Sequence, residues 1–162
     1  MKKSSFLLKN GLNYIAVCNI INLSNLGFDK GTKVMYNSIK SEKDIKNFLD
    51  NTNSLHDGFI IGVQYVNNGI SVKGNEYCFN PEQTKLTLQI MVTSICDTII
   101  EIEFENLIEW QIRDNQCDIV DTAVIFDKHN RIIWTDDTYI NEDELKKGSY
   151  VIAQSMKWRI IK

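Results

Sequence analysis

The sequence lacks the residue patterns that identify the common classes of enzyme and nucleic-acid-binding protein. Its formal net charge is -3, so it has no excess of Lys and Arg for binding phosphates, and we expect no nucleic-acid partner. No glycine-rich loop leads into a helix, and no serine or cysteine lies in a nucleophile motif. We therefore expect no cofactor. No apolar run approaches the roughly 20 residues that span a bilayer, so we expect no membrane segment either.

Cysteines are few, and no two of them are close together in the sequence. The four cysteines, which form no Cys-x-x-Cys pair, are Cys18, Cys78, Cys96 and Cys117. Their spacing excludes a zinc ribbon and a dithiol redox motif. We interpret them as buried or half-buried thiols in a reducing cytoplasm. The first residues imitate a signal peptide, but Lys9, Asn10, Gly11 and Asn13 interrupt the apolar region, so we expect a soluble, cytoplasmic protein.

Proline and glycine are also rare, with Pro81 alone and eight glycines, so no flexible linker divides the chain. A chain of 162 residues, of which 43% are hydrophobic, can bury one core. We therefore predict a single domain over residues 1–162. Residues 1–38 are predicted to form an N-terminal strand and loop region, and residues 39–160 a helix followed by an antiparallel β core.

The N-terminal region predicts two strands and one helix. The strands cover Leu12–Ile21 and Thr32–Tyr36, and the polar residues Asn22–Gly31 form a loop between them. The helix begins after Ser41, whose hydroxyl is a typical N-cap, and ends near Asn51–Asn53. Its buried face, spaced at i, i+3 and i+4, consists of Ile45, Phe48 and Leu49.

In the rest of the chain, the pattern of apolar residues predicts strands. Phe59–Val66 and Ile70–Val72 flank Asn67-Asn68-Gly69, a sequence typical of a tight type I′ hairpin turn. Further strands are expected at Leu86–Val92, Ile100–Phe104, Ile108–Ile112, Ile119–Phe126 as a central strand, Ile132–Thr135 and Tyr150–Ile161, the last with a bulge near Ala153–Ser155. A turn is predicted at Asp127–Asn130 and a short helix at Glu142–Lys147. Short connections favour antiparallel pairing, so the predicted fold class is mainly β (α+β): an antiparallel twisted sheet or β-sandwich packed against one principal helix.

The strongest chemical candidate is the step His56-Asp57-Gly58, which follows the predicted helix. An imidazole beside a carboxylate is half of a general acid/base pair or two ligands of a metal site. Neighbouring residues of a strand point to opposite faces, so both side chains reach one site only if the backbone turns there. The alternative is a structural step in which these side chains bind backbone groups where the helix meets the sheet.

A second candidate is the turn that contains Asp136 and Asp137, two carboxylates that could bind a cation or a protein partner together with Trp134. The spacing does not match a calcium loop, and a solvated turn with local hydrogen bonds is the alternative. If His56, Asp57, Asp136 and Asp137 converged in space, a metal-dependent hydrolase would be indicated. Nothing in the spacing requires this convergence, so we assign no metal site.

Three acidic residues, Glu101, Glu103 and Glu105, lie on one face of a predicted strand, about 7 Å apart. Cross-strand partners for them are expected among Arg113, Lys157 and Arg159. The face is predicted to be a solvated sheet face, with a charged recognition surface as the alternative.

Five segments of the chain resemble a group of small, uncharacterised bacterial β-rich domains with a (Phe/Leu)-His-Asp-(Ser/Gly) step. The segments are the helix Ser41–Leu49, the step Leu55-His56-Asp57-Gly58, and the strands containing Glu103-Phe104-Glu105, Ile133-Trp134-Thr135-Asp136 and Lys157-Trp158-Arg159. The resemblance covers roughly residues 39 to 160. Some members of this group are similar to immunity proteins of bacterial toxin systems, so the resemblance implies a toxin antagonist. It implies no catalytic activity.

Taken together, these patterns predict a non-enzymatic bacterial protein-binding module that engages a protein partner through a sheet face or edge, with toxin antagonism as a candidate role. One alternative is a metal-dependent, hydrolase-like enzyme that uses His56 and Asp57 with Asp136 and Asp137. Another is a structural or oligomerising domain whose strand edges pair across a two-fold axis.

Overall fold

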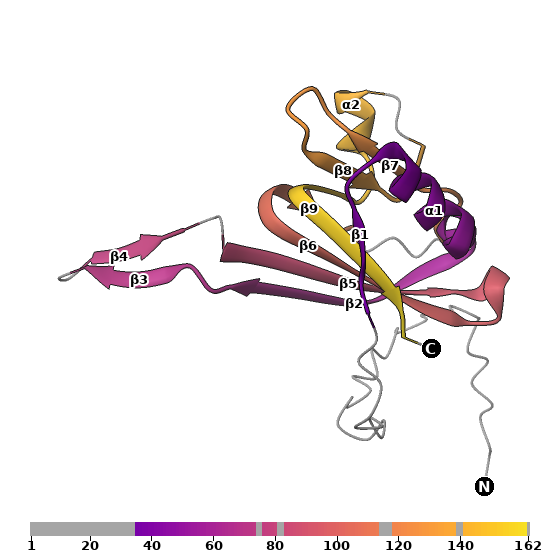
Figure 1. The fold of residues 1–162 in the computed structure, drawn as a ribbon, viewed down its shortest axis with the longest axis horizontal. Coiled ribbons are helices and arrows are strands. Elements are labelled where there is room, and N and C mark those ends of the chain that lie inside the picture. The colour runs from indigo at the N-terminus through magenta and orange to yellow at the C-terminus, as the bar shows by residue number, and fades with distance from the viewer. Residues whose placement is uncertain (1–34, 74–75, 81–82, 114–117, 139–140, 162) are drawn as a thin grey trace, which may run out of the picture. The chain divides into compact units, whose positions relative to one another are not determined.

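The computed structural model describes residues 35–73, 76–80, 83–113, 118–138 and 141–161 (Figure 1). All of them belong to one compact unit, Lys33–Lys162. The predicted strand Leu12–Ile21 and loop Asn22–Gly31 lie outside the described residues. None of the helices in the described part of the chain is long and apolar enough to cross a membrane.

The described residues form a mainly β fold with one principal helix, as the sequence predicts. In chain order the elements are β1 (Asn37–Ile39), α1 (Glu42–Thr52), β2 (Gly58–Asn67), β3 (Ile70–Lys73), β4 (Glu76–Phe79), β5 (Thr84–Val92), β6 (Thr98–Gln111), β7 (Ala123–Phe126), β8 (Ile132–Thr135), α2 (Glu142–Leu145) and β9 (Tyr150–Ile160). Short 3-10 turns follow α1 and β5. Of the predicted strand Thr32–Tyr36, the structure describes only residues 35 and 36. The prediction is wrong for these two residues, because they are irregular and β1 begins at Asn37.

Helix α1 forms as predicted. The Ser41 hydroxyl accepts a hydrogen bond from the Asp44 backbone N–H, and the helix ends where Asn53 adopts a left-handed conformation with φ of 50°. Its buried face packs on the sheet, where the Phe48 ring meets the Trp158 ring edge-on at a centroid distance of 5.4 Å. Trp158 is therefore a core residue.

One sheet contains most of the strands. Its order is β2-β5-β6-β9-β8-β7, and every pairing is antiparallel. Strand β1 pairs with Met156–Trp158 of β9, on the same side as β8, which pairs with Tyr150–Ala153. Among the described strands of this sheet, β2 and β7 are therefore its two ends.

Strict alternation along the central strands separates an apolar face from a polar one. The apolar face packs against α1, and its fully buried members on β5 and β6 are Leu86, Leu88, Ile90, Val92, Ile100, Ile102 and Phe104. The opposite face of the same strands has Lys85, Gln89 and the three glutamates. This division follows directly from the period of two that the sequence shows.

The predicted hairpin between Phe59–Val66 and Ile70–Val72 is wrong. Strand β2 pairs with β5, and β3 pairs with β4, so β2 and β3 run one after the other and never pair with each other. At the junction, the Asn67 side chain accepts the Gly69 N–H, and the Gly69 carbonyl accepts the Asn80 N–H. The chain instead reverses between Lys73 and Glu76, beyond the ends of β2 and β5 (Figure 1).

Two other predictions about strands need correction. Residues Ile119–Phe126 are not a central strand: β7 starts only at Ala123 and lies at the end of the sheet, and Ile119 makes an isolated bridge to Gly58. The bulge lies on β6 between Leu107 and Glu109, opposite a regular stretch of β9. Ile108 is the extra residue, which explains why the alternation changes phase there.

The predicted turn at Asp127–Asn130 is confirmed. The Asp127 carboxylate accepts the backbone N–H groups of His129 and Arg131 and forms an ion pair with the Arg131 guanidinium. Burial acts to raise the pKa of Asp127, but these hydrogen bonds from Arg131 and His129 outweigh it and lower the pKa to about 2. The turn therefore keeps a charged carboxylate at its centre.

Cys96 lies in the connection between β5 and β6, where it is exposed and free. The expectation of a buried or half-buried thiol is therefore wrong for this residue. Its backbone has φ of 60°, in the left-handed region, at the end of the short 3-10 turn that follows β5. The side chains of Cys18, Cys78 and Cys117 are not among those that the structure describes.

Candidate functional site

The His56-Asp57 step lies between the turn after α1 and the first residue of β2. The His56 Nδ1 atom lies 3.1 Å from the Asp57 Oδ1 atom, and the two side chains are 52% and 43% exposed. They can approach each other because Asp57 has a φ of 58°, which bends the chain away from the extended form. The backbone turn that a shared site requires is therefore present, and it brings the imidazole and the carboxylate together.

The backbone of this step is bound on both sides. The Asp57 N–H donates to the Ile119 carbonyl at 2.9 Å, and the Thr93 N–H donates to the Asp57 carbonyl at 3.2 Å. The Ser94 hydroxyl donates to the His56 carbonyl at 2.5 Å. Main-chain groups of the step thus bind two segments that are distant in sequence, one at Thr93 and Ser94 and one at Ile119. The two side chains bind each other and face solvent.

Gly58 completes this junction. A Cβ atom there would lie 2.5 Å from the Leu55 carbonyl oxygen, which is backbone and cannot rotate away. We expect Gly58→Ala to destabilise the protein by about 1–3 kcal/mol, the usual cost of overpacking. Gly62→Ala in the same strand is the control, because its Cβ would meet only the flexible Gln89 side chain at 3.2 Å. Urea unfolding midpoints of the two variants test the difference, and equal midpoints would contradict this role of Gly58.

The Asp136–Asp137 turn follows β8. Asp136 Oδ1 accepts the Ser149 backbone N–H at 2.8 Å, and Asp137 Oδ1 accepts the Thr138 N–H at 2.7 Å. The Asp137 bond is a local hydrogen bond of the kind that the structural alternative describes, whereas the Asp136 bond joins the turn to Ser149, 13 positions along the chain. The neighbouring Trp134 side chain is fully buried, so this predicted binding residue offers no surface to a partner and belongs to the core.

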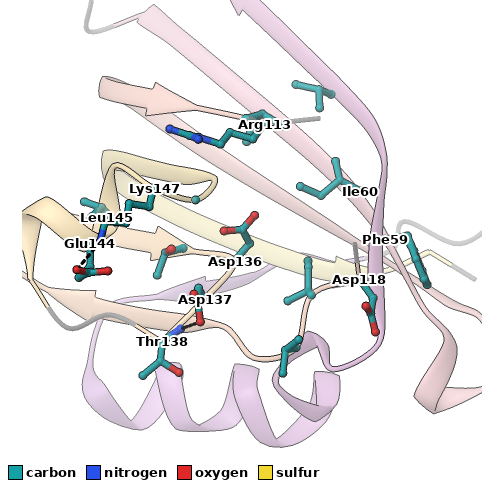
Figure 2. A pocket seen from close by; sticks show the side chains of 16 residues that line it. Phe59, Ile60, Arg113, Asp118, Asp136, Asp137, Thr138, Glu144, Leu145 and Lys147 are labelled. Carbon is teal, nitrogen blue, oxygen red and sulfur yellow. Dashed lines mark hydrogen bonds and ion pairs between the residues drawn. The ribbon is translucent and has the colours of Figure 1, made fainter. Parts of the chain in front are cut away.

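A pocket of about 720 Å³ adjoins this turn. Figure 2 shows Ile60 of β2 on one side of the pocket and Asp136 and Asp137 on the other. Apolar side chains from β2 and from the segment before β7 line it, together with four carboxylates and two cationic side chains. The charged members are Asp118, Asp136, Asp137, Glu144, Arg113 and Lys147.

The four residues of the hydrolase alternative are not gathered in this pocket. Asp136 and Asp137 line it, whereas His56 and Asp57 are not among its lining residues. Within the described part of the chain, no three His, Cys, Asp or Glu side chains are placed to hold a metal ion together. The structure thus brings together the members of each predicted pair but does not join the two pairs.

The three glutamates of β6 lie beside cations from β5 and β9. Lys157 Nζ lies 2.6 Å from Glu103 Oε1 and 2.9 Å from Glu105 Oε1. Lys85 Nζ lies 3.0 Å from the same Glu103 oxygen, and Arg159 pairs with Glu101 at 2.5 Å. We call these six residues, Lys85, Glu101, Glu103, Glu105, Lys157 and Arg159, the charge ladder. Its three negative and three positive groups balance.

The expectation that this face is solvated is wrong at two of the three glutamates. Glu101 and Glu103 are only 7% and 8% exposed. Tyr36 lies over the ladder: its hydroxyl donates to Glu101 at 2.6 Å, and the Arg159 guanidinium carbon lies 4.4 Å from its ring centroid. Burial and the hydrogen bond to Glu101 raise the pKa of Tyr36 to about 12. The sequence reasoning missed Tyr36 because nothing local marks a residue that packs across a distant strand.

The partners of the glutamates are only partly those predicted. Lys157 and Arg159 pair with them as expected, and Lys85 joins them from β5. Arg113 does not, because its guanidinium donates to the Lys146 carbonyl at 2.8 Å. The balanced charges favour a structural role over a charged recognition surface.

Acid should weaken this ladder. Burial acts to raise the pKa of Glu101, but hydrogen bonds from Tyr36, Gln89 and Arg159 lower it overall, and the hydrogen bond from Lys157 lowers the pKa of Glu105. Their contribution is complete above the unfolded pKa of about 4.3 and is lost as pH falls through the lower folded values. Urea midpoints should therefore be flat from pH 7 to about pH 5 and fall below it. Glu105→Gln should make that fall shallower, and an unchanged slope would contradict the assignment.

The outer side of β2 is the surface that the sequence reasoning did not single out. Four large apolar side chains of this strand are 40 to 49% exposed: Phe59, Ile61, Val63 and Tyr65. Within the described residues, β2 pairs only with β5, apart from the bridge from Gly58 to Ile119. We call the side of Phe59–Asn67 that faces away from β5 the β2 edge.

An aromatic pair adjoins the β2 edge. The Tyr65 and Trp110 rings stack at a centroid distance of 5.7 Å, and Trp110 is 38% exposed. Phe59, Ile60 and Val63 of the same strand line the pocket described above. Exposed aromatic and apolar groups beside a strand edge are the usual composition of a protein-binding surface. The signal that could have found this surface is the lack of any charged residue between Gly58 and Asn67.

Comparison of the chain with family models, curated proteins and solved structures found no match.

Proposed function

We propose that this chain is a non-enzymatic protein-binding module whose docking surface is the β2 edge. The observation that carries the proposal is a ten-residue end strand with four exposed large apolar side chains and no charged residue. Sheet ends normally protect themselves with short strands, charges, proline, bulges or a covering segment. Of the features that belong to the strand itself, β2 has one, the bulge between Ile60 and Gly62. An extended segment of a partner protein can add to such an edge by main-chain hydrogen bonds, with side-chain contacts giving specificity.

The other end of the sheet supports this choice by contrast. Strand β7 has only four residues, and the ion pair between Asp127 and Arg131 follows it directly. That end is short and charged, as protected ends are. The two ends of one sheet thus differ in the properties that decide whether another strand can add.

We propose toxin antagonism as the biological role, on the basis of the resemblance to small bacterial immunity-like domains. The expected arrangement is a gene for a larger secreted toxin next to the gene for this chain. Isothermal titration of the purified neighbouring product with this chain should then show binding. A gene with no such neighbour would contradict the antagonist role.

The docking surface is tested by a matched pair of variants. Val63→Lys places a charge on the β2 edge, whereas Ile108→Lys places one on the bulge of β6; both original side chains are 46% exposed. We expect Val63→Lys to weaken binding of the neighbouring product by more than about tenfold, because a lysine must be desolvated at the interface. Ile108→Lys should leave it unchanged. Equal binding by both variants would contradict docking on the β2 edge.

A further inference from the structure

We propose that the pocket beside the β2 edge receives an arginine side chain of the protein that docks there. The proposal rests on the proposed function, because it names a chemical feature of the partner for the same surface. Two features carry it: the position of the pocket on the sheet and the excess of carboxylates in its lining.

The pocket opens on the face of the sheet that packs against α1. Directly paired residues of neighbouring strands share a face, and Ile60 and Val63 are paired with Ile90 and Leu88, which are fully buried in the core. The register shift after Ile60 puts Ile60 and Val63 on this one face although they are three positions apart. No residue of α1 lines the pocket, and Val63 is 46% exposed. In the described part of the chain, the helix therefore leaves this part of the apolar face open.

Carboxylates outnumber cations in the lining of the pocket. There are four carboxylates and two cationic side chains. Glu144 and Lys147 bind each other, with Oε1 and Nζ 2.7 Å apart, and the Arg113 guanidinium donates to the Lys146 carbonyl. Three of the carboxylates form no ion pair with any described residue: Asp118, Asp136 and Asp137. A positive group that enters the pocket therefore meets negative charge that is not compensated there.

Two of these carboxylates are held in place by the backbone. Asp136 Oδ1 accepts the Ser149 N–H and Asp137 Oδ1 accepts the Thr138 N–H, whereas the Oδ2 atoms accept no hydrogen bond from the described residues. An arginine guanidinium has five N–H donors in a planar fork and is more weakly hydrated than a lysine ammonium. Free carboxylate oxygens in a partly apolar pocket therefore favour arginine over lysine.

The place of the pocket next to the β2 edge explains how the partner reaches it. Side chains of a strand alternate between the two faces of its sheet, so every second side chain of a segment added to β2 is on the face where the pocket opens. The apolar stem of an arginine on that face packs against Ile60 and Val63. Asp136 and Asp137 lie across the pocket from Ile60 (Figure 2), in the direction in which the guanidinium extends.

An NMR titration of the isotope-labelled full chain with N-acetyl-arginine amide tests the proposal. N-acetyl-citrulline amide, in which a neutral urea group replaces the guanidinium, is the matched compound. A ligand of about fifteen non-hydrogen atoms is expected to bind with millimolar affinity, so the titration extends to about 50 mM at constant ionic strength. The arginine compound should shift the amide signals of Ile60 and Thr135–Thr138. It should bind at least about fivefold more tightly than the citrulline compound, because hydrogen bonds between charged groups are the stronger ones.

Two variants that each remove one carboxylate locate the site. Asp137 and Asp121 are both exposed, and their Oδ1 atoms accept the N–H of the next residue at 2.7 Å and 2.8 Å, but Asp121 does not line the pocket. Asparagine keeps the oxygen that accepts this bond. Asp137→Asn should weaken binding of the arginine compound by at least about threefold, and Asp121→Asn should leave it unchanged. Equal binding by the two variants overturns the proposal. So does a wild type that binds both compounds equally or shows no shift at the pocket.

Binding of the neighbouring gene product separates this proposal from the proposed function. Asp137→Asn should weaken that binding, whereas Asp121→Asn should not. If the product binds Asp137→Asn as tightly as the wild type and is lost in Val63→Lys, docking on the β2 edge stands and the arginine proposal is wrong. If the product binds Val63→Lys as tightly as the wild type, the proposed docking surface is wrong, whatever the arginine compound does.

Discussion

Replacing Trp134 with alanine should destabilise the protein by about 3–5 kcal/mol, the usual cost of truncating a large buried aromatic side chain. Trp134 is fully buried on β8 and packs against Phe104 at a ring-centroid distance of 6.1 Å. A loss of this size approaches the whole free energy of unfolding of a marginal domain, which is about 5–15 kcal/mol. We therefore expect Trp134→Ala to be partly unfolded at 37 °C.

Two comparison variants separate the effect of burying a large side chain from any effect of the indole N–H. Trp134→Phe should cost much less than alanine, because it refills most of the volume and the indole N–H has no hydrogen-bond partner among the described residues. Trp110→Ala should cost about 1 kcal/mol, because that indole is half-exposed and loses mainly its stacking on Tyr65. Urea denaturation followed by circular dichroism measures all three. A similar loss for Trp134→Ala and Trp110→Ala would contradict the placement of β8 in the core.

Removing one cation from the charge ladder should have the second largest effect. Lys157→Met leaves the buried Glu103 carboxylate with Lys85 as its remaining cation and with the Glu105 charge close by. Hydrogen bonds to Glu103 and Glu105 raise the pKa of Lys157 to about 12 despite burial, so the ammonium group is charged throughout the working range. We expect a loss of about 2 kcal/mol, below the range for a buried charge left with no partner, because Lys85 still compensates part of the Glu103 charge.

A double-mutant cycle tests this explanation. Adding Glu103→Met to Lys157→Met should recover much of the stability, because replacing both members of a buried pair by apolar groups removes the uncompensated charge. Lys157→Arg should stay close to the wild type. If the double variant is less stable than Lys157→Met, the loss comes from packing of the lysine stem, and the electrostatic account of the ladder is wrong.

The sequence predicts the local parts of this fold well. Helix α1 follows from the Ser41 cap and the spacing of Ile45 and Phe48, which act within one or two turns of the chain. Strand β5 follows from the strict alternation between Leu86 and Val92. In both cases the residues that decide the structure are neighbours in sequence.

The errors concern strand pairing, which depends on residues far apart in the chain. Asn67-Asn68-Gly69 has the composition of a hairpin turn, yet β2 pairs with β5 through a register from Gly58–Val92 to Asn67–Thr84. Pairing with β5 forms nine residue pairs, interrupted by one register shift between Ile60 and Gly62, which is more than a short hairpin with Ile70–Val72 could form. Tertiary pairing thus overrides the turn preference of three residues.

The candidate site could be predicted only in part, for the same reason. The contact of His56 with Asp57 is local and was anticipated as a condition for a shared site. Burial of Glu101 depends on Tyr36 and Arg159, which are 65 and 58 positions away. Exposure of Val63 depends on β2 being the end strand of the sheet, and an apolar run such as Phe59–Val66 would ordinarily be assigned to a sheet interior.

Hydrogen exchange of the β2 amides in the presence of the neighbouring gene product tests the central claim most directly. The amides of β2 that do not bond to β5 should exchange rapidly in a dilute sample of this chain. They should become protected when the neighbouring product is added, and this protection should disappear in Val63→Lys. Binding that protects the charge-ladder strands and leaves the outer amides of β2 unchanged would contradict docking on the β2 edge.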